Sequence, residues 1–388
     1  MLLNQDINKA GVKICTRCIY DERMPEIHFD DQGVCNYCRR IEDLEKQYST
    51  GTEKGLKKFQ KIVDKIKDDG RGKRYDCVIG VSGGTDSSYL VYLMKEMGLR
   101  ILAVTYDGTW GEPIAVENMR KVLGALEIDL YTYTVNSGEV DDMFRAFFLS
   151  GVPEIEAATD LALAEAIYRS ADMYGIKYTI IGHSFVTEGI TPLDVNYFDG
   201  KYIKSIHKQF GKYSLKTFPQ MSFSHFLWWT CVARIKRIRP LWYISYTKEE
   251  ARKLLEEKFD WQYYGGHHLE NKMTKFCQSV YLPQKFKTDL RNNTLCGEVR
   301  MGKKSREDAW SEYNTPPKVD DVVDYFKERL GYSDEEYNKI MSAEPKHWTD
   351  YPTDKKRFEL LRPLFYILTK NNLVPMSFYL KYCFPKER

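Results

Sequence analysis

The sequence predicts an α/β protein with a parallel sheet, an amino-terminal metal-binding domain and a mainly helical carboxyl-terminal region. Short apolar segments alternate with amphipathic ones in the first half of the chain, and two CxxC pairs precede them. The segments expected to be strands are residues 75–81, 100–107, 129–135 and 177–183. Strands that alternate with helices form a parallel sheet covered on both faces.

The first domain is expected at residues 1–50, where residues 19–34 separate the two CxxC pairs. This spacing is typical of a zinc site with four thiolates: Cys15, Cys18, Cys35 and Cys38. A short domain buries little apolar surface, so the metal would supply folding energy. The alternatives are an iron–sulfur centre and two disulfides. Because the chain opens MLLNQDINKA, without a secretory segment, we expect the protein to be located in the cytoplasm, where disulfides are rare.

The first expected strand leads into residues 81–88, VSGGTDSS, and then into an amphipathic helix. Backbone N–H groups and the dipole at such a helix start bind phosphate. The loop lacks the Gly-Lys-Ser/Thr ending of a Walker A loop. Its members could bind ATP phosphates and Mg²⁺: Ser82, Gly83, Gly84, Thr85, Asp86 and Ser87. An ordinary strand-to-helix turn capped by Asp86 is the alternative.

Ligands of parallel sheets bind at the carboxyl ends of the strands. Asp107 ends the second expected strand, and Gly182 and His183 lie at the end of the fourth. These residues are therefore expected at the rim of the nucleotide site. The alternative for His183 is a hydrogen-bonded loop histidine with no role in proton transfer.

The nucleotide domain is expected at residues 56–200, after a polar linker. Residues 201–388 are aromatic and helical in character and would form a substrate or assembly region, with one helix capped by Thr247 and ending at Phe259. The 58 basic and 55 acidic residues nearly balance, which argues against a large nucleic-acid surface. No apolar run approaches membrane-spanning length.

The loop resembles the SGGxDS loop of the PP-loop ATP pyrophosphatases, which implies cleavage between the α- and β-phosphates of ATP. Together with the knuckle GVCNYC, the segment YGGHHLE at 264–270 and the pair Leu290-Arg291, it resembles the N-acetyl sugar amidotransferases of bacterial surface-polysaccharide biosynthesis over most of the chain. That family implies conversion of the acetamido group of a nucleotide-linked sugar or nonulosonic acid into an acetamidino group, through an adenylated imidate that ammonia attacks.

Such chemistry needs groups that stabilise the leaving pyrophosphate and orient the amide. Ser82, Asp86 and Arg291 are the expected catalytic residues, since arginine can hold phosphate with two parallel hydrogen bonds. The expected substrate-binding residues are His267, His268, Glu270, Arg300 and Lys303. The alternative is that the basic residues are solvated surface charges and the histidines face water.

None of the nine cysteines lies in a G-x-C-x-G elbow, and the chain does not open with cysteine. We therefore expect the chain to lack a glutaminase activity of its own. The resemblance implies a separate glutaminase with a channel-forming, cyclase-like subunit. Two other classes stay open: a PP-loop enzyme that modifies tRNA, and a nucleotide-binding regulator without catalytic activity.

Overall fold

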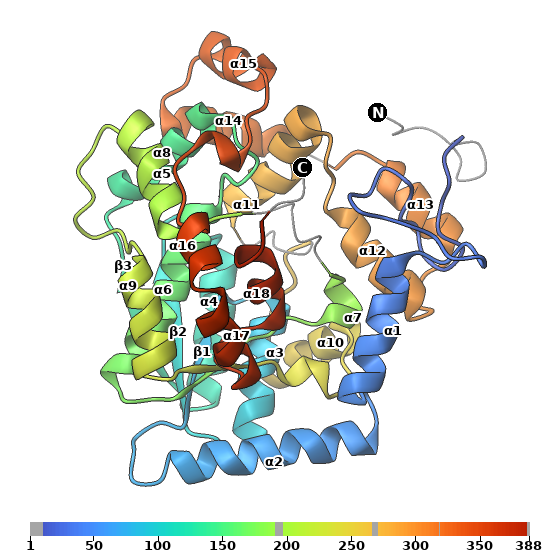
Figure 1. Ribbon diagram of the computed structural model, residues 1–388, viewed down its shortest axis with the longest axis vertical. Helices are drawn as coiled ribbons and strands as arrows, with labels where there is room; N and C mark the ends of the chain where they lie inside the picture. Colours follow the sequence, from blue (N-terminus) through green and yellow to red (C-terminus); the bar gives the residue numbers. More distant parts are fainter. Residues whose placement is uncertain (1–10, 191–196, 266–270, 318, 386–388) are drawn as a thin grey trace.

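The computed structural model describes residues 11–190, 197–265, 271–317 and 319–385. Its centre is a parallel sheet with strand order β3-β2-β1-β4-β5 (Figure 1). The strands are β1 (Cys77–Gly80), β2 (Ile101–Asp107), β3 (Asp129–Thr134), β4 (Tyr178–Ile180) and β5 (Lys236–Ile238).

The predicted α/β fold and its first four strands are confirmed, whereas β5 was not predicted. This strand has three residues, two of them cations, and none of the three is fully buried. It therefore lacks the apolar run that marks a buried strand. β5 pairs with β4 in parallel, so residues beyond 200 extend the nucleotide-domain sheet.

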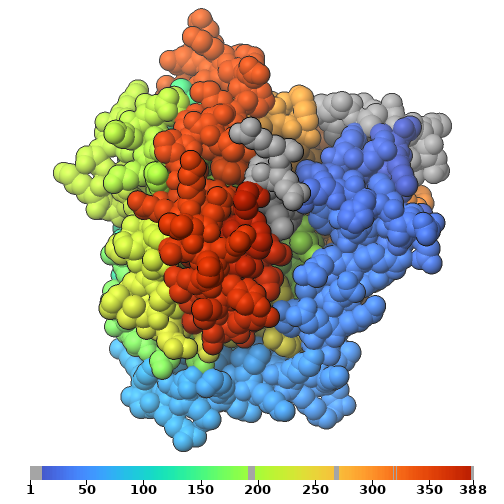
Figure 2. Space-filling view, in the orientation of Figure 1, coloured from blue at the N-terminus to red at the C-terminus, as the bar shows by residue number. Residues whose placement is uncertain are grey.

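Helices cover both faces of the sheet, because apolar side chains of β1 alternate between the two faces and are buried on both. Cys77 and Ile79 point to one face, and Val78 points to the other. The first face packs against α2 (Glu53–Asp69), α3 (Thr85–Glu96), α4 (Pro113–Ala125) and α10 (Lys248–Phe259). The second packs against α6 (Ala157–Met173) and η2 (Trp228–Val232). Figure 2 shows α2 along the lower edge of the molecule.

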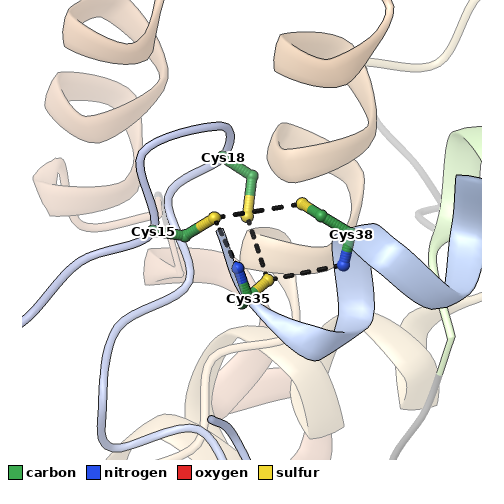
Figure 3. A group of neighbouring side chains, drawn as sticks. All are labelled: Cys15, Cys18, Cys35 and Cys38. Carbon is green, nitrogen blue, oxygen red and sulfur yellow. Dashed lines mark hydrogen bonds between the residues drawn. The ribbon is translucent and has the colours of Figure 1, made fainter. Parts of the chain in front are cut away.

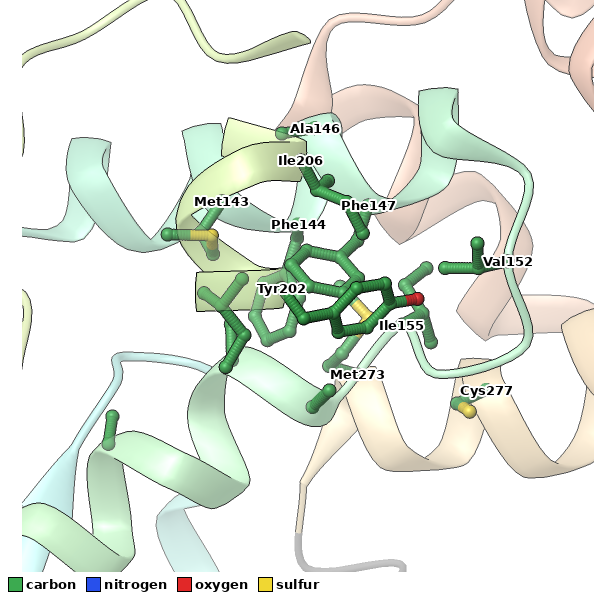
Figure 4. Packing of buried hydrophobic residues seen from close by; sticks show 14 of the residues in the cluster. Met143, Phe144, Ala146, Phe147, Val152, Ile155, Tyr202, Ile206, Met273 and Cys277 are labelled. Atoms are coloured by element: carbon green, nitrogen blue, oxygen red, sulfur yellow. The ribbon is translucent and has the colours of Figure 1, made fainter. Parts of the chain in front are cut away.

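A larger, mainly helical core lies beside the sheet, and aromatic side chains dominate it. Phe147 of α5 and Tyr202 of α8 meet edge to face with ring centroids 6.0 Å apart (Figure 4). The helices of this core are α5 (Ser137–Ser150), α8 (Gly200–Phe210), α9 (Phe223–Leu227), α11 (Lys272–Phe276), η4 (Cys277–Phe286), α14 (Asp320–Leu330), α15 (Asp334–Ser342), η5 (Trp348–Asp350), α16 (Lys355–Leu360), α17 (Arg362–Lys370) and α18 (Met376–Tyr382).

The amino-terminal knuckle and α1 (Asn36–Tyr48) lie against α12 (Arg291–Arg300) and α13 (Arg306–Asn314), although these segments are far apart in sequence (Figure 1). The cysteines pack with Leu295, Ala309 and Trp310 in one buried cluster. The short helices α7 (Phe185–Glu188) and η3 (Pro240–Trp242) lie next to α1. The segments that follow β1 and β4 line one common cavity together with α10 and α12.

Candidate nucleotide site and metal centre

The loop after β1 has a backbone that only glycine can adopt at residue 83. Gly83 has φ +80°, and a Cβ atom built there would lie 1.9 Å from the carbonyl oxygen of Ala115. Gly84 follows as the N-cap of α3, and no side chain caps that helix. The first N–H groups of α3 therefore remain available to an anion, and the helix dipole favours one.

Side chains hold this loop in its turn. The Ser82 hydroxyl accepts a hydrogen bond from Gly84 N at 3.3 Å, and Ser87 Oγ donates to the Gly84 carbonyl at 3.2 Å. The indole Nε1 of buried Trp261 donates to the Gly83 carbonyl at 3.1 Å. The protein's own contacts thus hold the loop in its turn, which lowers the entropic cost of binding an anion there.

Asp86 lies in the first turn of α3 with a tyrosine and a lysine beside its carboxylate. The Tyr246 hydroxyl donates to Oδ1, and Lys248 Nζ lies 3.3 Å from Oδ2. Burial, and secondarily the Asp86 charge, raises the pKa of Tyr246, so it stays a donor. Neither partner was predicted from the sequence. The one available signal was a lysine in the first turn of α10, where the helix dipole disfavours a cation.

The loop opens into a cavity of about 520 Å³, a size typical of small-molecule sites. The sheet side of its lining comprises Ser82, Gly84, Thr85, Asp86, Ser87, Gly182, His183 and Glu188. Arg252 of α10 also lines the cavity and lies over the Tyr263 ring at 3.8 Å, and its Nε has no hydrogen-bond partner among the described residues. The arrangement can hold an anion between a helix start and basic side chains.

His183 lines this cavity next to the phosphate loop. Burial, followed by the nearby Arg239 charge, lowers its pKa to about 4. The imidazole is therefore neutral at pH 7. Trp242 Nε1 lies 3.4 Å from His183 Nδ1, which suits Nδ1 as the acceptor.

Arg291 also lines the cavity, but its guanidinium is already engaged. It forms an ion pair with Asp289 at 2.7 Å. The remaining donors reach the main-chain carbonyls of Glu312, Tyr313 and Thr315 at 2.8–3.2 Å. Arg291 thus ties α12 to the carboxyl-terminal end of α13, and its contact with a phosphate stays a prediction.

Other expected residues lie elsewhere. Asp107 is exposed at the end of β2, is not among the cavity-lining residues, and accepts a hydrogen bond from Thr109 N at 3.0 Å. Lys303 is exposed and lines a second cavity of about 270 Å³ near the end of α1. Arg300 lies beside the cysteine cluster rather than in the large cavity. His267, His268 and Glu270 lie outside the described residues.

The four knuckle cysteines converge as the sequence predicts (Figure 3). All are buried, and their sulfur atoms lie within 4.8 Å of one another, with Cys15–Cys38 at 4.0 Å and Cys18–Cys35 at 3.9 Å. A tetrahedron with Zn–S bonds of about 2.3 Å has edges of about 3.8 Å. The spacing therefore fits one tetrahedral ion, whereas a four-iron cluster would hold the thiolates farther apart.

The knuckle backbone also favours thiolates. Four N–H groups donate to the sulfur atoms at 3.2–3.5 Å, those of Arg17, Tyr20, Cys35 and Cys38. A thiolate is the form that binds metal. None of these cysteines forms a disulfide.

Part of the cavity lining lies in a segment that is similar to a known protein domain. Residues 270–364 match the profile of the C-terminal domain of WbpG-like lipopolysaccharide biosynthesis proteins. This part of the chain is thus similar to a WbpG-like C-terminal domain. The matched segment supplies a further part of the cavity lining: Gln278, Ser279, Leu290, Arg291, Thr294, Leu295, Glu298, Glu312 and Pro317.

Individual relatives match smaller parts of the chain. An uncharacterized protein of Methanocaldococcus jannaschii is 26% identical over 171 residues, which is 44% of this chain and 58% of the relative. The tRNA-specific 2-thiouridylase MnmA of Clostridium acetobutylicum is 32% identical over 125 residues, 27% of this chain and 35% of that enzyme. The match thus spans about a third to three fifths of these relatives.

Solved structures overlap only loosely with this chain. The NMN synthetase of Francisella tularensis has a TM-score of 0.32 and 16% identity, covering 72% of this chain and 93% of that one. The U34-tRNA thiolase NcsA of Methanococcus maripaludis, solved with its [4Fe-4S] cluster, has a TM-score of 0.33 and 13% identity, covering 85% and 96%. The fold assignment rests on the sheet described above. In the described ranges, no helix is both long and apolar enough to cross a membrane.

Proposed function

We propose that the protein is an ATP-dependent amidotransferase of lipopolysaccharide, O-antigen or related glycan biosynthesis. Its substrate would be the acetamido group of a nucleotide-linked N-acetyl sugar or nonulosonic acid, and its product the acetamidino group. One observation carries the proposal: a single cavity joins the SGGTDS loop to the domain matched by the WbpG-like profile. A phosphate-binding loop and a glycan-biosynthesis domain would thus act on the same bound reactants.

The chemistry follows from the weakness of an amide as an electrophile. The amide oxygen attacks the α-phosphorus of ATP, the bond to the β-phosphate oxygen breaks, and pyrophosphate leaves. The resulting imidate carries AMP on its oxygen. Ammonia adds to the imidate carbon, the C–O bond breaks, and AMP departs with that oxygen. After a proton is released from the ammonia nitrogen, NH stands where the carbonyl oxygen stood.

The phosphate side of this reaction fits the loop. The uncapped N–H groups of α3 and the hydroxyls of Ser82 and Ser87 would bind the pyrophosphate. Asp86 would help to hold Mg²⁺, whose chemistry is to neutralise charge on the phosphates. Lys248 and Arg252 line the cavity and would add positive charge near the same oxygens. The carboxylate of Asp86 is already oriented by Tyr246.

The nitrogen would come from a separate glutaminase through a channel-forming, cyclase-like subunit. The carboxylate side chains of Glu188 and Glu298 line the cavity and could accept the proton that ammonia loses after attack. The amino-terminal cysteines would hold Zn²⁺ as a structural ion, because their spacing fits a mononuclear tetrahedral site.

Mass spectrometry tests the proposal directly. Purified protein would receive ATP, Mg²⁺, ammonium and a panel of UDP- and CMP-linked N-acetyl sugars and nonulosonic acids. The expected result is AMP together with one sugar lighter by the difference between O and NH. The matched control is the same sugar with a free amino group instead of the acetamido group. AMP formation that is independent of the acetamido group would contradict the proposal.

A second candidate function is tRNA thiolation, which the similarity to 2-thiouridylases favours. Thiolation of this kind often uses a cysteine near the nucleotide. Among the described residues that line the cavity, none is a cysteine. AMP release with tRNA, and with none of the sugars, would select this second function.

A further inference from the structure

A charged side chain lies beside the cysteine cluster without an ordinary partner. The three guanidinium nitrogen atoms of Arg300 are shielded from solvent and have no hydrogen-bond partner among the described residues. Arginine keeps its charge in proteins. A buried, unpaired charge is strongly destabilising, so the native surroundings of Arg300 should contain a compensating anion.

The neighbours of Arg300 identify that anion. The groups that act on it most strongly by charge are Cys296, Cys18, Cys38 and Tyr20, and none is a carboxylate. The phenol of Tyr20 is a hydrogen-bond donor to Asn293 Oδ1, so it carries its proton and no charge. The negative charge must therefore come from sulfur. Four thiolates around one divalent cation carry two net negative charges, which a neutral set of thiols would not provide.

We infer that Arg300 is the counter-ion of the metal–thiolate centre, and that the bound metal thereby fixes the position of α12. Arg300 is the last residue of α12, and Cys296, one turn earlier, packs with the metal-site cysteines. The Tyr20 hydroxyl donates to Asn293 Oδ1 at 2.6 Å, which attaches the same helix to the knuckle at a second point. Arg300 is thus a positioning residue rather than a substrate contact.

The consequence reaches the large cavity, because α12 contributes to its far wall. Thr294, Leu295 and Glu298 line the cavity, and Leu295 also belongs to the cysteine cluster. On another side, Gly297 lies so close to α7 that an added Cβ would be 2.6 Å from the Thr187 carbonyl oxygen. Metal occupancy would therefore set the position of a wall that the proposed function assigns to the sugar, and this last step rests on that function.

Metal affinity tests the inference without any assay of activity. The full-length protein is loaded with Zn²⁺ and titrated with a chromophoric chelator. Arg300→Met should weaken metal binding about 10- to 100-fold, the range found for groups that support metal ligands. Arg300→Lys, which keeps the charge, should recover most of that loss. Arg23→Met is the matched control, because Arg23 lies in the same knuckle, half exposed and paired with Asp21.

Co²⁺ substitution gives a second readout, since the thiolate-to-metal absorption depends on the charge near the sulfur atoms. This band should shift in Arg300→Met and stay unchanged in Arg23→Met. Equal metal affinity in wild type and Arg300→Met would overturn the inference. So would an Arg300→Lys variant that loses as much affinity as Arg300→Met. If Arg300→Met does not fold, Arg300→Lys decides alone: affinity near that of the wild type supports the counter-ion, and a loss of tenfold or more contradicts it.

A separate measurement tests whether the bound metal fixes the position of α12 in the cavity wall. Hydrogen exchange in α12 should accelerate when the metal is removed, while exchange in α3 stays unchanged. Unchanged protection of α12 would refute the link even if the counter-ion role holds. Neither measurement uses a sugar, so failure of the proposed reaction would be distinguishable from failure of this inference.

Discussion

The two sides of the large cavity are built in different ways. The phosphate side is a continuous loop and helix start, residues 82–87, that presents mainly backbone N–H groups. The far side is assembled from side chains of η4, α12 and the end of α13, and α12 and α13 also pack against the cysteine cluster. A short segment fixes the first side, whereas packing between distant segments fixes the second. Damage to each side should therefore have different effects.

Loss of the metal is expected to have the largest effect on folding and to separate the two sides in their ligand affinities. Replacing Cys15 and Cys18 by serine should abolish metal binding and remove the folding energy of the knuckle. The phosphate side does not contact the knuckle cysteines, so nucleotide affinity should stay within about threefold while sugar KM rises about tenfold. Calorimetry with a nonhydrolysable ATP analogue and steady-state kinetics measure the two effects. Cys231→Ser, outside the cluster, is the control. A parallel loss of nucleotide affinity would show that the two sides are not separate.

The next effect should come from the loop itself. Gly83→Ala places a Cβ against the Ala115 carbonyl and disfavours the observed φ, which costs about 1–3 kcal/mol. The displaced loop should lower AMP formation about a hundredfold or more. Gly124→Ala is the matched control, since Gly124 lies in α4 with open space around a built Cβ. Near-normal turnover of Gly83→Ala would mean that the loop does not hold the reacting phosphates.

The largely buried imidazole of His183, which lies on the phosphate side, should make the stability of the folded protein depend on pH. Its pKa is about 4 in the folded protein and about 6.5 when unfolded. The unfolded state therefore binds the extra proton first, and stability is lost as pH falls from about 6.5 to 4. The loss attributable to His183 between pH 7 and pH 5 is about 2 kcal/mol. Denaturant unfolding of the wild type and His183→Asn should show this difference in slope. An identical pH dependence of both proteins would exclude the desolvated imidazole as its source.

The smallest effect on activity should come from Lys248, which lies beside Asp86 where α10 meets the phosphate loop. Lys248→Met removes the cation 3.3 Å from the Asp86 carboxylate. Loss of one charge-assisted contact should lower kcat/KM for ATP about tenfold and increase the Mg²⁺ concentration needed for half-maximal rate. Lys253→Met is the control, because Lys253 is an exposed lysine of the same helix. If Lys253→Met lowers the rate equally, the effect comes from helix charge in general.

The same contrast explains what sequence reasoning could predict. The phosphate loop and the cysteine knuckle are local motifs, so their residues could be named before the structure was known. Tyr246 could not, because folding brings it to Asp86 from 160 positions away. Arg300 was expected at the ligand for its charge, but its place on α12 directs it to the cysteines. Net charge and spacing do not show which side of a helix faces which neighbour.

Gly83 also limits how the molecule can move. Its backbone is packed against the Ala115 main chain, and its carbonyl accepts a hydrogen bond from buried Trp261. A segment shut in on both sides cannot swing outward as a lid. Any change in the width of the cavity is therefore expected to come from the other segments that line it, so a variant that stiffens one of those segments should slow ligand exchange while leaving the loop unchanged.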